Sequence, residues 1–362
     1  MHTISRRQLG AFGVAASLFP ATHAAADASA GTKAEPVDEG LFVPINGMEQ
    51  WITIRGRDRR NPVLLLLHGG PGFPMTFLAP LLAEWERDFT LVVWDQPGGG
   101  PTHAKNKAAG EGPLSIERYV VDGLVVAEFA RQRLGVQKLV LMGVSWGTLL
   151  GVTMIKRRPE LFAAYVGTSQ VVSGPEGDRL GYELGLKAAR ERGDAVAVAA
   201  LEKVGTPPYA RFEDFLVRQT YTNPPGLPPS PAEAAAQAAQ GRLLAVPPPP
   251  DARYIPKGLP PTDFMQTFMA TQRQMQPQTA LWEARSLGSE FEVPIFVMQG
   301  ENDLNTPVAL AEAWIDGVRE PAKAFEIIPG AGHNTIAFAG ELLTLLKKHL
   351  RPTLRAAASP RT

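Results

Sequence analysis

The chain has 362 residues, 44% hydrophobic and 20% charged, enough for a large globular core in one domain with an insertion or in two domains. Its 36 Lys and Arg residues balance 36 Asp and Glu residues, so the charge gives no indication of a nucleic-acid or anionic-membrane partner. It contains no cysteine, which excludes disulfides, thiolate metal sites and a cysteine nucleophile.

The N-terminal segment, residues 1–26, is typical of a bacterial export signal. Arg6 and Arg7 precede a short apolar run, and a stretch of small residues, ATHAAADA, follows. This pattern predicts a twin-arginine signal peptide, cleaved after Ala24 or Ala26, and a product in the periplasm or outside the cell. The alternative is a disordered or membrane-anchoring N-terminus. Because the apolar run is too short to span a bilayer, we expect no stable membrane anchor.

Predicted strands and helices alternate along residues 41–168. Residues 42–56 alternate between apolar and polar around Asn46-Gly47, which is the pattern of a β-hairpin. Continuous apolar runs predict buried strands at 62–70, 90–96, 138–142 and 163–168, and amphipathic stretches predict helices at 115–135 and 146–158. Such alternation builds an α/β fold, with a mostly parallel sheet and helices on both faces.

The alternation stops between residues 169 and 289. Two helical stretches lead into a proline-rich region, residues 206–261, where the density of proline excludes sheet interiors and long helices. The alternation then resumes with strands at 293–300 and 324–330 and helices from 307 and over 334–350. The sequence therefore predicts one sheet domain, residues 41–168 and 290–352, interrupted by a helical, proline-rich lid, residues 169–289.

The segment GVSWG places Ser145 between a predicted buried strand and a predicted helix. A side chain at such a junction can be exposed on a tight turn at the carboxyl end of the sheet. That turn leaves little room for side chains at the flanking positions, Gly143 and Gly147. The segment therefore predicts a nucleophilic serine, although Gly-x-Ser-x-Gly can also arise by chance in a glycine-rich loop.

A serine hydroxyl needs a base to take its proton, and the base needs a carboxylate to orient it. Four histidines follow the predicted signal. We expect His349 on a solvated helix surface and His103 in a polar loop. His68 immediately follows a predicted buried strand, and we expect it to fix the loop after that strand. His333 stands between the last predicted strand and the last helix, where a loop residue can reach the carboxyl edge of the sheet. His333 is therefore the predicted base.

Asp303 follows a predicted buried strand in the segment GENDLNTP. We predict it as the orienting carboxylate in preference to Glu301, because a glycine and an asparagine form a turn that would aim it. The alternative is an aspartate that caps a turn or a helix. The order Ser145, Asp303, His333 along the chain is one that serine triads are known to take.

The segment HGGPG, residues 68–72, can present the amide of Gly70 to a developing oxyanion, and the amide of Trp146 would be the second donor. This glycine cluster lacks a following Gly-Lys-Ser/Thr, so nucleotide binding is not predicted. The sequence has no His-Glu-x-x-His motif and no tight His/Asp cluster. We therefore predict no metal and no cofactor.

Five segments, HGGPG, WDQPGGG, GVSWGT, GENDLNTP and GAGH, together resemble the proline iminopeptidase branch of the α/β-hydrolase fold. The resemblance covers residues 41–170 and 291–350, and Pro97 stands where the family usually has an arginine. It implies a helical lid over a serine-triad site and an activity that releases N-terminal proline or other residues from short peptides. Carried over by position, it implies Ser145 as nucleophile, Asp303 as acid, His333 as base, and Gly70 and Trp146 as oxyanion donors.

Together these features predict an exported serine hydrolase that forms an acyl-enzyme with a small-molecule or short-peptide substrate. An aminopeptidase is favoured over the alternative, an esterase or amidase acting on small non-peptide substrates. A catalytically silent binding protein with the same fold is the alternative from a different class. The sequence does not predict an oligomeric state.

A lid that reads the amino end of a substrate needs a carboxylate, because an ammonium group in a dry pocket requires a charged partner. Glu176 and Glu183 are seven residues apart and would share one face of a helix. Glu283, beside Trp282, is a further candidate. The alternative is that Glu183 pairs in solvent with Lys187, four residues later.

Overall fold

The computed structural model describes residues 34–222, 255–259 and 263–358. The predicted export signal and most of the proline-rich region lie outside these residues. Of the helices within them, none combines the length and the apolarity needed to cross a membrane.

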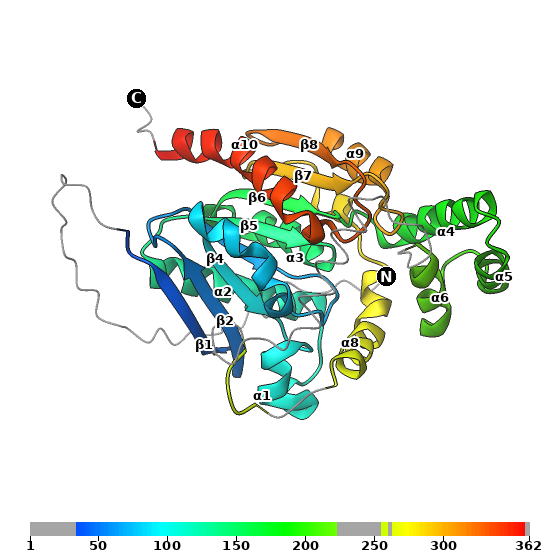
Figure 1. Ribbon diagram of the computed structural model, residues 1–362, viewed down its shortest axis with the longest axis horizontal. Helices are drawn as coiled ribbons and strands as arrows, with labels where there is room; N and C mark the ends of the chain where they lie inside the picture. Colours follow the sequence, from blue (N-terminus) through cyan, green and yellow to red (C-terminus); the bar gives the residue numbers. More distant parts are fainter. Residues whose placement is uncertain (1–33, 223–254, 260–262, 359–362) are drawn as a thin grey trace, which may run out of the picture. The chain divides into compact units, whose positions relative to one another are not determined.

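An eight-stranded sheet in the order β1-β2-β4-β3-β5-β6-β7-β8 forms the centre of the described fold (Figure 1). β2 pairs in antiparallel with both β1 and β4, and the other neighbouring strands pair in parallel. The strands are β1 (Val37–Ile45), β2 (Met48–Gly56), β3 (Val63–Leu67), β4 (Thr90–Asp95), β5 (Leu139–Val144), β6 (Phe162–Thr168), β7 (Ile295–Gly300) and β8 (Lys323–Ile328). The mostly parallel sheet predicted from the sequence is confirmed.

The first two strands form the hairpin that Asn46-Gly47 predicted. Both residues have positive φ, 47° at Asn46 and 84° at Gly47, as a two-residue hairpin turn requires. Ile45 and Met48 pair directly across the turn. The turn therefore sets the register of β1 against β2.

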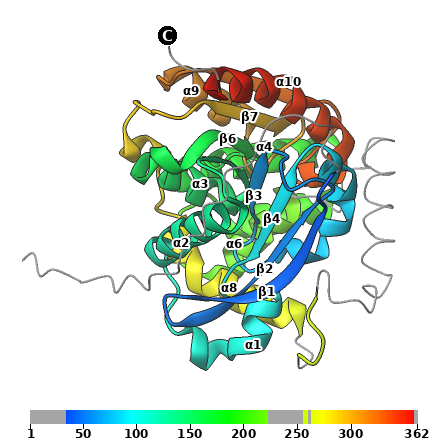
Figure 2. The same ribbon diagram turned by 90° about the vertical axis from the view of Figure 1, so that its left-hand side faces the viewer.

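Helices cover both faces of the sheet (Figures 1 and 2). On one face, α2 (Ile116–Leu134), α3 (Trp146–Arg157) and α9 (Val308–Gly317) bury apolar side chains against the strands. On the other face, the 3-10 segment η2 (Ala79–Arg87) and α10 (Ala339–Ala358) do the same. The five side chains of β3 are at most 2% exposed, which explains why such strands are continuous apolar runs in the sequence.

Between β6 and β7 the chain forms the insertion, a group of helices outside the sheet. These helices are α4 (Gly174–Glu191), α5 (Ala195–Val204), α6 (Phe212–Thr222) and α8 (Phe264–Thr279). α4, α5 and α6 pack on one another, and an ion pair between Arg273 of α8 and Glu213 of α6 (2.8 Å) joins α8 to this group. A hydrogen bond from Thr271 Oγ1 of α8 to the Gly98 carbonyl (2.8 Å) joins α8 to the loop after β4.

Among the α-helices of the described residues, three were not predicted from the sequence. α1 (Gly100–Glu111) begins at the last glycine of a run of three, with Pro101 in its first turn, where proline is tolerated. α6 falls within the proline-rich region but occupies a stretch without proline. α8 ends near Pro277, in its last turn. In each case the sequence beside or within the helix contains glycine or proline, which are typical of loops, so the sequence pattern did not indicate a helix.

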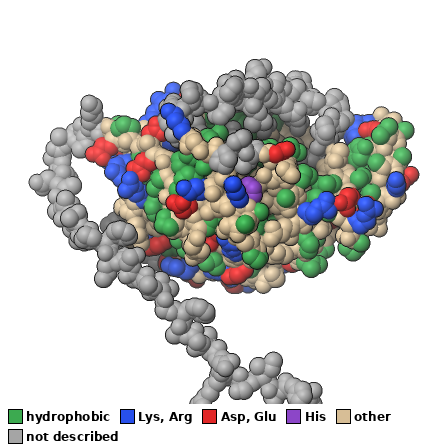
Figure 3. Space-filling view, turned by 90° about the horizontal axis from the view of Figure 1, so that it is seen from below, with side chains coloured by type: hydrophobic (Ala, Val, Ile, Leu, Met, Phe, Trp, Pro, Cys, Tyr) green, Lys and Arg blue, Asp and Glu red, His purple; other side chains and the backbone are tan. Residues whose placement is uncertain are grey.

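On the face of the molecule in Figure 3, acidic and basic side chains of the described residues lie interspersed. Exposed ion pairs also occur among the described residues, for example Arg179 with Glu183 and Arg157 with Glu117. Pairs of this kind contribute little to stability, because solvent screens both charges.

Candidate active site

Ser145 lies on a tight turn between β5 and α3. Its backbone has φ 50° and ψ −117°, a conformation that a non-glycine residue rarely adopts. A Cβ atom at Gly143 would lie 2.6 Å from the Gly147 carbonyl oxygen, and one at Gly147 would overlap the Leu67 carbonyl oxygen. The two flanking glycines therefore allow α3 to approach β3 and β5 closely enough to hold Ser145 on this turn.

Ser145, His333 and Asp303 lie in one hydrogen-bonded line. Ser145 Oγ is 2.8 Å from His333 Nε2, and His333 Nδ1 is 3.0 and 2.9 Å from the two Asp303 carboxylate oxygens. The three residues follow β5, β8 and β7, so the carboxyl ends of parallel strands bring them together. Because a carboxylate only accepts hydrogen bonds, His333 Nδ1–H donates to Asp303 and Nε2 is left to accept the Ser145 proton.

Asp303 is buried and held as a carboxylate, with 0% of its side chain exposed. Burial alone would raise its pKa, but electrostatic attraction to His333 and hydrogen bonds from His333 and Thr306 outweigh burial and hold the pKa below its usual value. The carboxylate also accepts hydrogen bonds from the backbone N–H of Asn305 (2.9 Å) and from Gln299 Nε2 (3.1 Å). The sequence motif pointed to Asp303 but not to these donors, two of which lie in the same GENDLNTP segment.

Gly70 and Trp146 line the same cavity as Ser145, from the loop after β3 and from the start of α3. Gly70 has φ 114°, and a Cβ atom there would lie 2.7 Å from the amide nitrogens of both Gly72 and Phe73. Only glycine fits this conformation, so the predicted oxyanion loop depends on it.

Gln96 joins this loop to the start of α3. Its side-chain Oε1 accepts a hydrogen bond from the Trp146 indole N–H (3.0 Å), and its backbone N–H donates to His68 Nε2 (3.0 Å). Burial lowers the pKa of His68 to about 4, so the ring is neutral and its Nδ1–H donates to the Gly69 carbonyl (2.7 Å). His68 thus holds the loop after β3, as expected. The role of Gln96 was missed, although it stands in the WDQPGGG segment.

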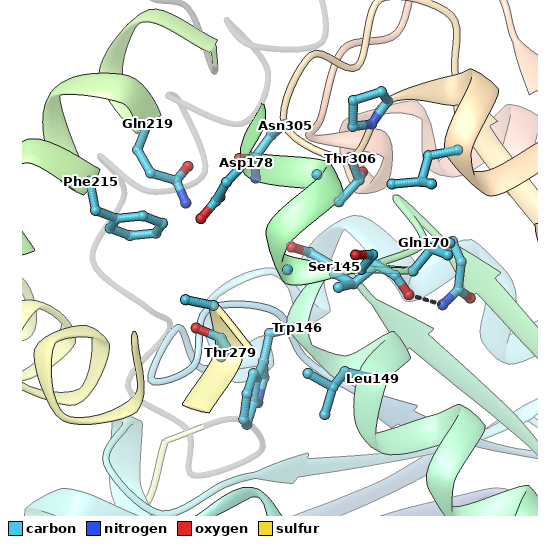
Figure 4. Close-up of a pocket in the computed structure, with 18 of the residues that line it drawn as sticks. Ser145, Trp146, Leu149, Gln170, Asp178, Phe215, Gln219, Thr279, Asn305 and Thr306 are labelled. Carbon is cyan, nitrogen blue, oxygen red and sulfur yellow. Dashed lines mark hydrogen bonds between the residues drawn. The ribbon is translucent and has the colours of Figure 1, made fainter. Parts of the chain in front are cut away.

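Two cavities meet at Ser145. One has a volume of about 100 Å³ and the other of about 510 Å³. Among the described residues, the smaller cavity has one carboxylate, Asp178, and one guanidinium, Arg218, in its lining. Figure 4 shows Phe215 and Gln219 on one side of this cavity, Ser145 on the other, and Asp178 beside Asn305. Both cavities are lined by Gly70, Ser145, Phe215, Gln219, Gln272 and Asn305.

Arg218 of α6 connects the insertion to the loop that carries Asp303. Its side chain is 3% exposed, forms an ion pair with Asp178 of α4, and donates from Nη1 to Asn305 Oδ1 (2.7 Å). Because a guanidinium only donates, this bond turns the amide nitrogen of Asn305 toward His333, where it lies 3.1 Å from Nε2. No local motif marks Arg218, and sequence reasoning missed it.

Residues 62–339 match the family described as alpha/beta hydrolase fold. The chain belongs to this family. It is 31% identical over 174 residues to the probable aminopeptidase YbaC of Bacillus subtilis (strain 168), covering 48% of this chain and 54%, about half, of that protein. It is 23% identical over 302 residues to a proline iminopeptidase of Lactobacillus delbrueckii subsp. lactis, covering 81% of this chain and 90% of that one.

Solved structures show the same fold. The proline iminopeptidase of Mycobacterium smegmatis is 19% identical to this chain, with a TM-score of 0.56 over 88% of this chain and all of that one (100%). The predicted fold and the resemblance to proline iminopeptidases are confirmed, and the protein is an α/β-fold hydrolase.

Two histidines of this hydrolase lie in surroundings that differ from the expected ones. His103 is in α1 rather than in a loop, with Nδ1 2.8 Å from Glu111 Oε2. His349 was expected on a solvated surface, but its side chain is only 15% exposed. It stacks on Phe296 with ring centroids 5.1 Å apart and lies 2.7 Å from Glu326, because α10 turns this face toward the sheet.

The structure does not bring Glu176, Glu183 and Glu283 to Ser145. Glu183 is 49% exposed and pairs at 2.8 Å with Arg179 rather than with Lys187. Glu176 and Glu283 lie 2.7 and 3.7 Å from Arg285. None of the three glutamates is among the described residues that line the two cavities.

Within the described ranges, no group of three or more His, Cys, Asp or Glu residues could hold a metal ion.

Proposed function

We propose that this hydrolase is a serine hydrolase that acts through an acyl-enzyme. The observation that carries the proposal is the hydrogen-bonded line from Ser145 through His333 to Asp303. His333 takes the Ser145 proton as Oγ attacks the substrate carbonyl, and the amides of Gly70 and Trp146 stabilise the oxyanion. His333 then gives the proton to the leaving group, and water, activated by the same histidine, releases the acyl group.

The substrate we propose is the free amino end of a short peptide, from which the enzyme releases proline or another residue. The names of two relatives, a probable aminopeptidase and a proline iminopeptidase, support this. Asp178 supports it as well, because a cationic amine in a cavity needs a carboxylate partner. Burial raises the pKa of Asp178 and Arg218 opposes this, so Arg218 helps to keep the carboxylate ionised beside the incoming amine.

Hydrolysis of prolyl-arylamide and its N-acetylated analogue tests the aminopeptidase proposal. The wild type should strongly prefer the free amine, and Asp178→Asn should remove most of that preference. Glu183→Gln, at an exposed position of the same helix, is the matched control and should leave the preference unchanged. Equal hydrolysis of both substrates by the wild type would contradict the proposal and favour the esterase or amidase alternative. Labelling with a fluorophosphonate separates either enzyme from a catalytically silent binding protein.

The remaining proposals concern the rest of the chain. We propose that the insertion acts as a lid over the site, and that residues 1–26 direct export through the twin-arginine route. Replacing both Arg6 and Arg7 by lysine should block export and leave activity in the cytoplasm. Unchanged periplasmic activity of this double variant would contradict the export proposal.

A further inference from the structure

The two cavities beside Ser145 contain different parts of the proposed machinery. His333 lines the larger cavity and Trp146 lines the smaller one, while Ser145 and Gly70 line both. The nucleophile and one proposed oxyanion donor, Gly70, therefore stand where the two cavities join, while the other donor, Trp146, stands in the smaller cavity and the base in the larger one.

This placement decides which half of a substrate each cavity holds. As the C–N bond to the leaving group breaks, the departing nitrogen takes the proton that His333 removed from Ser145, while Oγ stays bonded to the acyl carbon. The departing nitrogen must therefore lie within hydrogen-bond reach of His333 Nε2. The leaving group accordingly occupies the larger cavity, and the acyl group occupies the smaller cavity with Asp178.

The larger cavity offers an apolar environment. Phe73 from the loop after β3, Phe268 and Met269 from α8, and Ile336 from the segment before α10 contribute to its lining. Phe73 and Phe268 meet edge to face with ring centroids 6.0 Å apart. Among the described residues that line this cavity there is no Lys, Arg, Asp or Glu. A charged group entering here would lose water without gaining a partner, whereas an apolar side chain would be stabilised.

We propose that this hydrolase selects substrates with a bulky, uncharged, apolar leaving group, and that Phe268 and Met269 determine this preference. In a peptide, this group is a large apolar side chain on the residue that follows the released one. The volumes of about 100 and 510 Å³ match a small acyl group and a larger leaving group. The proposal rests on the proposed function, since it assigns the two halves of the same substrate.

A series of prolyl amides with one acyl group and different leaving groups tests this proposal. The substrates are prolylglycinamide, prolylphenylalaninamide and the α-amide of prolylglutamate. We expect kcat/KM for the phenylalanine substrate to exceed that for the glycine substrate by roughly 10- to 100-fold, the effect of burying one aromatic side chain. The glutamate substrate should fall below the glycine substrate. Equal values for the three would overturn the proposal.

Substitutions on α8 identify the residues responsible. Phe268→Ala and Met269→Ala should each lower the phenylalanine-to-glycine ratio by roughly 3- to 10-fold, and thermal unfolding checks that each variant is folded. Met265→Ala is the matched control, because Met265 lies on the same helix but is 55% exposed and outside the cavity lining. A ratio that is unchanged in the first two variants, or equally lowered in the control, would contradict the assignment.

Failure of the proposed function gives a different result from failure of this inference. If no prolyl amide is hydrolysed, the aminopeptidase proposal is wrong, and benzyl acetate compared with ethyl acetate then tests the same cavity. A preference for the benzyl ester supports the inference, and equal rates overturn it. An absence of hydrolysis of both esters and amides overturns the serine hydrolase proposal and the inference together.

Discussion

The carboxyl edge of the sheet and the insertion contribute to the same site in different ways. At the sheet edge, Ser145 directly follows β5, and Asp303 and His333 lie in the short loops after β7 and β8, so the ends of paired strands place all three. In the insertion, Asp178 and Arg218 lie on helices outside the sheet and reach the site through side-chain hydrogen bonds. Under the proposed function, the strand ends carry out the chemistry and the helices of the insertion select the substrate.

Ser145→Ala should have the largest effect and act on the sheet edge alone. We expect turnover to fall by about 10⁴-fold or more, because loss of a triad member removes the nucleophile. The melting temperature should stay close to that of the wild type, since only a partly exposed hydroxyl is removed. Steady-state kinetics and thermal unfolding measure both. Retention of more than a few per cent of activity, with contamination excluded, would show that Ser145 is not the nucleophile.

Asp303→Asn should follow, with a loss in kcat of roughly 10³- to 10⁴-fold in a folded enzyme. The asparagine amide can donate to His333 Nδ1 and so favours the tautomer in which Nε2 cannot accept the serine proton. Asp316→Asn is the matched control, because Asp316 is an exposed aspartate on α9. Equal kcat values for the two variants would mean that Asp303 is not the carboxylate that orients His333.

Arg218→Met tests whether the two regions are separate. If Arg218 only shapes the cavity, KM for prolyl-arylamide rises and kcat is unchanged. We expect kcat to fall as well, by roughly 10- to 100-fold, because Arg218 orients the Asn305 amide that lies 3.1 Å from His333 Nε2. A fluorophosphonate has no amine for Asp178 to bind, so its reaction with Ser145 reports on the nucleophile and base alone. We expect the rate of this labelling to fall together with kcat.

The control for this experiment is Arg179→Met, at a 52% exposed arginine of α4. Loss of Arg218 also leaves Asp178 buried without its ion-pair partner, which costs about 3 to 5 kcal/mol. Kinetics should therefore be measured well below the melting temperature of the variant. An unchanged kcat and labelling rate would restrict the insertion to substrate selection.

The sequence predicted the sheet edge far better than the insertion, for a physical reason. Strands buried on both faces must be continuously apolar, so they are easily recognised in a sequence. A residue that closely follows such a strand must lie at the carboxyl edge of the sheet. A helix is different, because its periodicity shows which residues share a face but not which face meets the cavity. Asp178 lies two residues after Glu176, a rotation of about 200° around α4. Glu176 therefore pairs with Arg285, while Asp178 lines the smaller cavity.

The smallest effect on activity is expected from a second buried carboxylate at the sheet edge, Asp95 at the end of β4. Its side chain is 0% exposed and accepts hydrogen bonds from the amide (3.2 Å) and the hydroxyl of Thr76. Burial raises its pKa to about 7 from the ordinary value of 3.8, against the opposing effect of these hydrogen bonds. Asp95 is not part of the hydrogen-bonded line to Ser145, so Asp95→Asn should leave kcat within a few-fold of the wild type.

The effect of Asp95→Asn should instead be on how stability depends on pH. Because the folded state raises the pKa, the stabilisation from the neutral Asp95 carboxyl is fully present below about pH 4 and is lost as the pH rises through 7. Asparagine does not ionise, so the free energy of unfolding of the wild type should fall relative to that of the variant by up to about 4 kcal/mol over this range. Urea unfolding of both proteins at pH 5, 6.5 and 8 measures the difference, with Asp316→Asn as the exposed control. A difference between wild type and variant that does not change with pH would mean that Asp95 is already ionised at pH 5, and that the sheet edge tolerates a buried charge there as it does at Asp303.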